Sequence, residues 1–91
     1  MFVKQLDNYI FVAPAVRRKN KKYDAYTLDG KYITSFGALN YQHYRDDKIG
    51  YYKDLSHNDK NRRDRYRKRH MNDNLDNPYS AGYLSWHYLW T

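Results

Sequence analysis

Cysteine and glutamate are both absent from this 91-residue chain. Without cysteine no disulfide can form, and because small secreted domains usually carry disulfides, we expect a reducing compartment. Without glutamate, all ten acidic residues are Asp, which favours helix caps and turns over helix interiors. The acidic residues are therefore expected to mark the ends of secondary-structure elements.

Long apolar runs are missing as well. The apolar stretch from Tyr9 to Ala15 is far shorter than the roughly 20 residues of a membrane-spanning helix, and Pro14 interrupts it. It is also too short for the core of a secretory signal. The sequence therefore predicts neither a membrane span nor a cleaved leader.

Catalytic and metal-binding motifs are not found either. The four histidines, at positions 43, 57, 70 and 87, are scattered and show no metal-ligand spacing. There is no phosphate-binding glycine loop and no Gly-X-Ser-X-Gly motif. His57, close to Asp59, is expected to belong to a helix cap, and His70 to suit a helix C-terminus. The sequence predicts a non-enzymatic protein with no catalytic residues, no cofactor, no metal and no small-molecule substrate.

Positive charge and aromatic rings are what the chain has in excess. Its 17 Lys and Arg exceed its ten Asp and give a net charge of +7, and Tyr alone contributes 12 residues. Such a charge favours polyanionic partners, namely nucleic acid, acidic protein surfaces or anionic lipid, with solubility alone as the other explanation. A tyrosine-rich core must also place its hydroxyls. We expect one domain over residues 1–91, either marginally stable alone or stabilised by docking onto a larger body.

The Asp29-Gly30 dipeptide gives the clearest turn signal. β-forming residues flank it on both sides, and Asp-Gly supplies the positive φ angles of a two-residue hairpin turn. Residues 1–36 are therefore expected to be mainly β, with one or two further strands before residue 16. A two-residue loop predicts the following cross-strand pairs: Leu28 with Lys31, Thr27 with Tyr32, Tyr26 with Ile33, and Tyr23 with Phe36.

Residues 38–91 are expected to be mainly helical. The chain as a whole predicts an α+β fold, in which a small antiparallel sheet, the hairpin plus an N-terminal strand, is packed by two to three helices. The predicted helices are a short one from Ala38 to Arg45, one that follows a cap at Ser56 or Asn58 and runs to about His70, and a last one from Ala81 to Trp90 capped by Ser80.

The segment 58–71 carries most of the charge. It holds seven of the 17 cationic residues against two Asp, and its only apolar residues are Tyr66 and Met71. The Arg guanidinium matches phosphate and carboxylate, but it also stacks on rings, so these cations could bind a partner or could pair internally. The candidate partner-binding or polyanion-binding residues are Lys60, Arg62, Arg63, Arg65, Tyr66, Arg67, Lys68 and Arg69.

Two further segments are candidates for binding. A secondary basic loop precedes the hairpin, and the C-terminal segment carries rings at helical spacing, which indicates either a helix that closes the core or an aromatic anchor for another protein. No zinc-finger, RNP-like, basic-zipper or helix-turn-helix motif occurs, so any nucleic-acid binding should be weakly specific and strongly salt-dependent. The basic-loop residues are Arg17, Arg18, Lys19, Lys21 and Lys22, and the anchor residues are Tyr83, Trp86 and Trp90.

Residues 57–70 follow the pattern His-X-Asp-X-X-Arg-Arg-X-X-Tyr-X-X-Arg-His. Around it stand Gly37, Tyr41 and Tyr44 on one side, and Ala81-Gly82, Ser85 and Leu89-Trp90 on the other. Over residues 22–90 this pattern resembles a family of small basic proteins of unknown function that is widespread in large nucleocytoplasmic DNA viruses. Asn58 departs from the family, in which Lys is commoner at that position.

The resemblance implies a setting rather than a mechanism, because the family brings no catalytic residues. It implies a virion component made in the host cytoplasm, such as a minor capsid or cement protein that binds neighbouring virion proteins. The alternative is a sequence-independent nucleic-acid-binding protein that packages or condenses the genome. Tyrosine-rich surfaces favour the first reading, and the charge favours the second.

Overall fold

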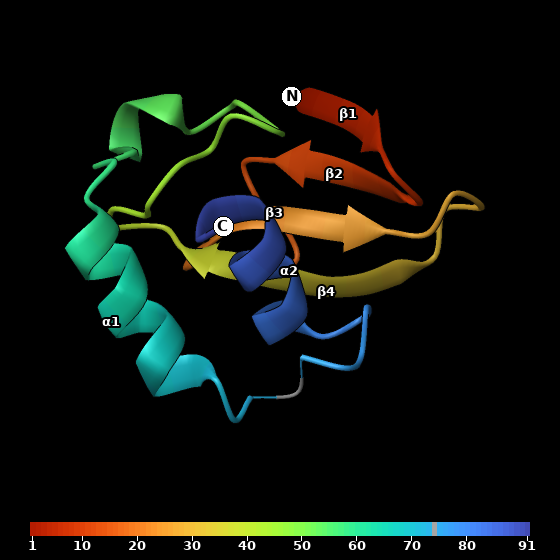
Figure 1. Cartoon of the computed structure of the whole chain (residues 1–91). Helices are drawn as coiled ribbons and strands as arrows, with labels where there is room; N and C mark the ends of the chain where they lie inside the picture. The colour runs from red at the N-terminus through yellow and green to blue at the C-terminus, as the bar shows by residue number, and fades with distance from the viewer. Residues whose placement is uncertain (74) are drawn as a thin grey trace.

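A four-stranded antiparallel sheet forms the first part of the computed structural model, which describes residues 1–73 and 75–91 (Figure 1). The strands pair in chain order, so each connection joins neighbours. The α+β class and the antiparallel sheet predicted from the sequence are confirmed. The strands are β1 (Phe2–Leu6), β2 (Tyr9–Ala13), β3 (Lys21–Tyr26) and β4 (Tyr32–Ala38).

The hairpin between β3 and β4 has a longer loop than predicted. The backbone N–H of Thr27 donates to the carbonyl of Lys31 at 2.8 Å, which leaves residues 28–30 as a three-residue loop. Gly30 closes this loop at a φ of +90°, a value that suits glycine. The predicted pairing of Leu28 with Lys31 is therefore wrong, although the turn lies where Asp-Gly placed it.

A β-bulge then corrects the register along this hairpin. Tyr26 pairs with Tyr32 rather than with its predicted partner. The register shifts between Ala25 and Tyr26, because a bulge adds one residue to one strand only. Beyond the bulge Tyr23 pairs with Phe36, as predicted.

Two α-helices and a short 3-10 turn follow the sheet. The last helix begins at its predicted cap, since the Ser80 side chain accepts a hydrogen bond from Tyr83 N at 3.1 Å. None of the helices formed by the described residues combines the length and apolar character needed to cross a bilayer. The elements are η1 (Lys53–Leu55), α1 (Lys60–His70) and α2 (Ala81–Leu89).

The helix predicted from Ala38 to Arg45 is wrong, because this stretch is extended and turn-like. Its backbone pairs with a segment further along the chain. His43 donates to the carbonyl of Leu55 at 3.1 Å, and His57 donates to the carbonyl of His43 at 3.0 Å. Local helix propensity cannot reveal such a distant partner.

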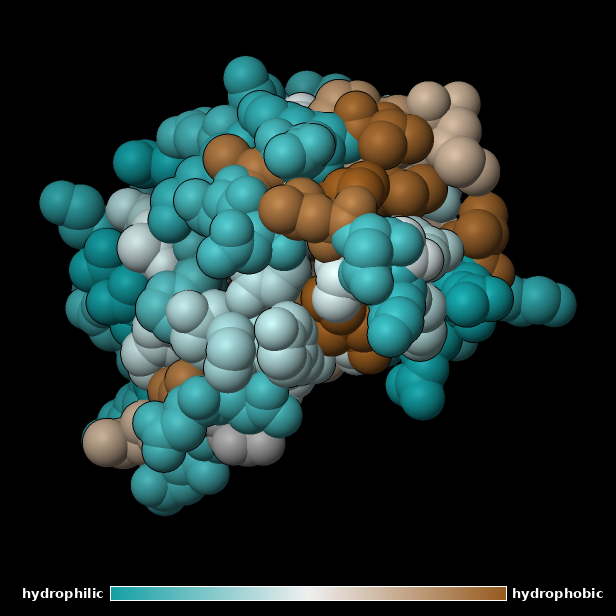
Figure 2. Space-filling view, turned by 90° about the vertical axis from the view of Figure 1, so that its right-hand side faces the viewer, coloured by the Kyte–Doolittle hydropathy of each residue, from teal (hydrophilic) through white to brown (hydrophobic). Residues whose placement is uncertain are grey.

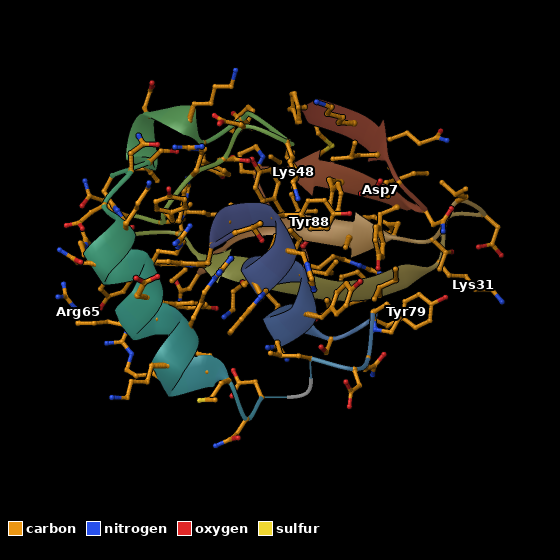
Figure 3. All side chains as sticks on the ribbon, viewed as in Figure 1. Asp7, Lys31, Lys48, Arg65, Tyr79 and Tyr88 are labelled. Carbon is orange, nitrogen blue, oxygen red and sulfur yellow. The ribbon has the colours of Figure 1, made fainter. Side chains whose placement is uncertain are left out.

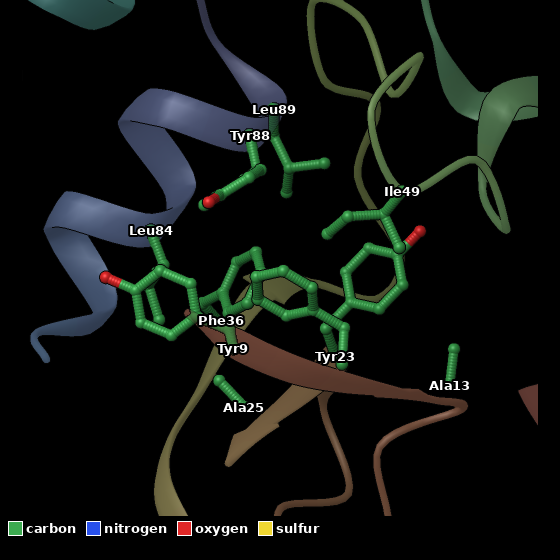
Figure 4. Close-up of a cluster of buried hydrophobic side chains, with 10 residues drawn as sticks. Tyr9, Ala13, Tyr23, Ala25, Phe36, Ile49, Leu84, Tyr88 and Leu89 are labelled. Carbon is green, nitrogen blue, oxygen red and sulfur yellow. The ribbon is translucent and has the colours of Figure 1, made fainter. Parts of the chain in front are cut away.

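The aromatic core lies between α2 and one face of the sheet (Figures 1 and 4). Phe11, Tyr23 and Phe36 come from the strands and are fully buried, and α2 contributes Leu84 and Tyr88. The ring of Phe11 lies 5.7 Å from that of Phe36 and 4.9 Å from that of Tyr88, both near edge-on, a geometry that aromatic pairs favour. Of the two interpretations that the sequence left open for the C-terminal segment, the helix that closes the core is confirmed.

The tyrosines of this core place their hydroxyls on acceptors from other parts of the chain. Such bonds compensate the cost of burying an O–H group. They also tie the core to the loops around it, and Figure 3 shows one such pair, Asp7 and Tyr88. The hydroxyls of Tyr9, Tyr23 and Tyr88 donate to the Pro78 carbonyl, the Asp46 carboxylate and the Asp7 carboxylate.

The opposite face of the sheet is only partly covered. The register places Val3, Val12 and Asp24 on this face. The loop after β2 folds over part of it, because Asp24 accepts hydrogen bonds from the backbone of Val16 at 2.8 Å and of Arg17 at 3.1 Å. Val3 stays 59% exposed. Figure 2 shows hydrophobic side chains gathered at the top and right of the end view of the molecule.

Candidate polyanion-binding surface

Helix α1 lies beside the sheet and α2, and none of its residues is fully buried (Figure 1). Its cap is Asp59, one residue beyond Asn58 and three beyond Ser56, the two predicted positions. The Asp59 carboxylate accepts from Asn61 N at 2.9 Å and Arg62 N at 3.3 Å. His57 belongs to this cap as predicted, because its Nδ1 accepts from Asp59 N at 2.9 Å. Basic residues 67–70 occupy the last turn, where a helix attracts positive charge.

One side of α1 is held against the end of α2 by a ring stack. Tyr66 lies parallel to Trp90, with ring centroids 4.1 Å apart and an interplanar angle of 4°. Arg67 donates from Nε to the Trp90 carbonyl at 3.1 Å and lies over the Trp86 ring at 5.4 Å. Tyr66 and Arg67 are therefore used in contacts within the protein. This was one of the two possibilities predicted for the 58–71 segment, the other being contact with a partner.

Two further arginines of α1 also contact the protein itself. The Arg63 guanidinium lies 5.0 Å from the ring centroid of Tyr44, and it pairs with Asp64 at 3.2 Å. Arg62 donates to the Gln42 side chain at 2.8 Å. Both arginines are half-buried, so part of the charge of α1 serves to hold the helix in place.

The other side of α1 carries cations that face solvent. Arg65 projects away from the sheet (Figure 3). Across residues 1–73 and 75–91 the ion pairs involve only Arg45, Arg63 and His70 among the basic side chains, so the exposed cations of α1 have no acidic partner there. The exposed cations of α1 are Lys60, Arg65, Lys68 and Arg69.

The basic loop is likewise divided between inner and outer roles. Arg17, Arg18 and Lys19 are all exposed, and the Arg17 guanidinium also lies 4.7 Å from the ring centroid of Tyr32. Lys21 is half-buried, and Lys22 is only 1% exposed. Lys22 therefore does not belong to an exposed loop, because it already lies within β3 and its side chain turns inward.

The Lys22 ammonium is buried, and no carboxylate in the described part of the chain forms an ion pair with it. Its Nζ donates to the Tyr41 carbonyl at 2.6 Å and meets His43 Nδ1 at 2.9 Å. Burial lowers the pKa of Lys22 to about 8, although the negative charge of Asp46 opposes this shift. Burial and the nearby ammonium together lower the pKa of His43 to about 4. His43 is therefore neutral at pH 7.

Ser56 is the third residue in the row of contacts that starts at Lys22 and His43, but its hydroxyl is not activated for catalysis. His43 Nε2 lies 3.2 Å from the Ser56 hydroxyl. Because His43 Nδ1 faces the Lys22 ammonium, the one N–H proton of the neutral ring lies on Nε2. Nε2 therefore cannot accept a proton from the Ser56 hydroxyl. A catalytic histidine instead has a carboxylate next to Nδ1. No group of three or more His, Cys or acidic side chains with metal-binding geometry occurs among the described residues.

The two basic segments meet at a groove of about 390 Å³. Lys21 and Lys22 come from the start of β3, and Arg69 and His70 come from the last turn of α1. No Asp is among the residues that line the groove, and the remaining residues of its lining are Gly37, Ala38, Tyr41, Gln42, Tyr66, Ser85, Leu89 and Trp90. Sequence reasoning found both basic segments but not their proximity, and it missed Tyr41.

The predicted aromatic anchor is not an exposed set of rings. Tyr83, Trp86 and Trp90 are all half-buried. The Tyr83 ring lies 4.2 Å from His87, and both tryptophans contact α1. These rings bind parts of the chain itself, so the structure gives no support to their use as an anchor for another protein.

Comparison with protein-family models, with curated proteins and with solved structures finds no match to the chain. The resemblance to the viral family therefore stays a prediction that rests on the residues quoted above. The functional argument consequently rests on the geometry of α1, the basic loop and the groove.

Proposed function

We propose that this chain binds nucleic acid through its phosphates, without sequence preference. The observation that carries the proposal is the set of exposed α1 cations, which form no ion pair with the acidic residues that the structure describes. They lie next to a groove whose lining, in the described part of the chain, adds further cations and no acid. Phosphate contacts from such a surface supply affinity but little base readout.

Salt dependence tests the proposal directly. Each phosphate contact on duplex DNA contributes about −0.9 to the slope of log K against log salt, so one contact from each of the four exposed α1 cations gives about −3.6. The measurement is fluorescence anisotropy of a labelled duplex titrated with the protein between about 50 and 200 mM salt. A flat response, or no binding at low salt, would contradict the proposal.

Two double variants with the same net charge distinguish binding at α1 from binding that depends on net charge alone. Arg65→Gln with Lys68→Gln removes two exposed cations of α1, whereas Lys31→Gln with Lys53→Gln removes two exposed cations elsewhere. The first should reduce the salt slope by about two and the second should leave it nearly unchanged. Equal effects of the two variants would show that net charge alone drives binding.

A second candidate function is a minor capsid or cement component that binds neighbouring virion proteins. The observation in its favour is the partly uncovered sheet face, where Val3 is 59% exposed, together with Val16 in the loop after β2, which is 63% exposed. Exposed apolar surface of this kind commonly marks protein contacts. Mass spectrometry of purified virus particles tests it, and absence of the chain from the particle would remove this candidate and the virion localisation with it.

A further inference from the structure

The groove between α1 and the start of β3 has the charge of an anion site. Lys21 and Arg69 lie at it, and neither forms an ion pair within the described residues. His70 also lines it, with its Nδ1 2.7 Å from Asp73. With no carboxylate in the lining, the potential inside the groove is positive, and converging walls of low dielectric strengthen it.

Lys22 gives the groove a feature that a solvated basic surface lacks. It lines the groove and is 1% exposed, and its two hydrogen-bond partners are a carbonyl and a neutral histidine rather than an acid. Asp46 acts on Lys22 electrostatically, but among the described residues no carboxylate forms an ion pair with this ammonium, and a buried ammonium so weakly compensated is unfavourable. An anion in the groove adds negative charge next to it and so gains more from this site than from an exposed lysine.

Tyr41 gives the groove an exposed ring. Its side chain is 72% exposed, although tyrosine rings elsewhere in this chain are largely used for packing. Its backbone is fixed, because the carbonyl accepts from Lys22 Nζ at 2.6 Å and the N–H donates to the Ala38 carbonyl at 3.2 Å. An aromatic ring on a fixed backbone, beside cations, is the arrangement with which proteins stack the bases of single strands.

We propose that the groove binds one nucleotide unit of a single-stranded nucleic acid, with the phosphate at Lys21 and Arg69 and the base against Tyr41. This inference rests on the proposed function and adds a preference for single strands. The groove volume of about 390 Å³ suits one small ligand unit rather than a duplex. In a duplex the bases are stacked inside and their faces are not available to Tyr41, so only the phosphate contacts remain.

The test compares a labelled oligothymidylate with a labelled duplex of the same length, titrated with the full chain at low and high salt. The unaltered chain should bind the single strand more tightly. Tyr41→Ala should weaken single-strand binding about tenfold and change duplex binding by less than about twofold. Tyr79→Ala is the matched control, because Tyr79 is also exposed and lies far from α1 (Figure 3), and it should change neither.

Inorganic polyphosphate separates the phosphate contacts from the stacking. Lys21→Gln should weaken polyphosphate and single-strand binding alike, whereas Tyr41→Ala should weaken only the single strand. If Tyr41→Ala has no effect, or lowers affinity for duplex and single strand equally, the groove does not hold a nucleotide, although phosphate binding by α1 stands. If no polyanion binds at low salt, both this inference and the proposed function fail.

Discussion

Helices α1 and α2 are similar in length, 11 and nine residues, and each begins at a side-chain cap, yet the fold uses them differently. Helix α2 buries Leu84, Tyr88 and Leu89 against the sheet. Helix α1 buries no residue and is held mainly by Tyr66 and Arg67. The stability of the domain therefore lies in the sheet and α2, and α1 depends on a small set of ring and guanidinium contacts.

This difference shows how a strongly basic helix can be kept in a small protein. Burying its cations would be unfavourable, so only the side that meets rings is used for attachment. The opposite side is then free of any structural requirement. Its charge can change without loss of the fold, which is the property expected of a binding surface.

The largest effect should come from α2. Leu84→Ala removes a fully buried side chain and should lower the free energy of unfolding by about 3 kcal/mol. Denaturant unfolding followed by circular dichroism measures this loss. Leu28→Ala, at a half-exposed position in the hairpin loop, serves as the control and should change stability by less than about 0.5 kcal/mol. Similar losses at the two sites would contradict the assignment of the core.

Lys22 lies in β3, in the part of the domain that holds most of the stability, yet it is a buried charge. Its pKa is about 8 in the fold and 10.5 unfolded, so between these values the unfolded chain binds more protons and stability rises with pH. The gain should reach about 1 kcal/mol from pH 8 to pH 9, where most tyrosines of the unfolded chain are still protonated. Lys22→Met should abolish this rise, whereas Lys31→Met should retain it. A wild-type stability that falls over this window would contradict the burial of the ammonium.

Tyr66→Ala should release α1 while leaving the rest of the domain folded. Loss of the stack on Trp90 should cost about 1–2 kcal/mol. Hydrogen exchange resolves the location of the change: the amides of α1 should exchange faster, and those of β2 and β3 should not. Tyr66→Phe keeps the ring and should largely restore protection. Uniform loss of protection would mean that α1 and the core unfold together.

The smallest effect on stability should come from the exposed side of α1. Arg65→Gln removes a side chain that projects into solvent and should change the free energy of unfolding by less than about 0.5 kcal/mol. Arg67→Gln, on the inner side of the same helix, should cost about 1 kcal/mol because its carbonyl bond and its ring contact are lost. Thermal unfolding of the pair measures the difference. Equal losses of unfolding free energy in the two variants would contradict the assignment of an inner and an outer side to α1.

Local signals predicted the elements that depend on near neighbours in sequence. Asp29-Gly30 located the hairpin, and Ser80 located the start of α2. The cap of α1 was predicted at Ser56 or Asn58 and lies at Asp59, since all three residue types are good caps and only the backbone decides between them. The loop length was wrong because a bulge after Ala25 restores the register, and no residue type there requires a bulge.

Features set by distant contacts could not be predicted in this way. The charge pattern of α1 identified the candidate cations but not which of them meet rings, since the orientation of the helix is set by Trp90 on another element. Residues 38–45 pair with a later segment rather than forming a helix. Burial of Lys22 has no local signal, because a lysine beside exposed basic residues is normally solvated.

The stack of Tyr66 on Trp90 has a practical consequence for spectroscopy. The chain has two tryptophans, and both contact α1, one through this stack and the other beneath Arg67. Tryptophan emission therefore reports chiefly whether α1 is attached rather than whether the sheet is folded. An emission change without a matching change in circular dichroism marks detachment of the helix, so the protein carries an intrinsic fluorescent probe of its most basic element.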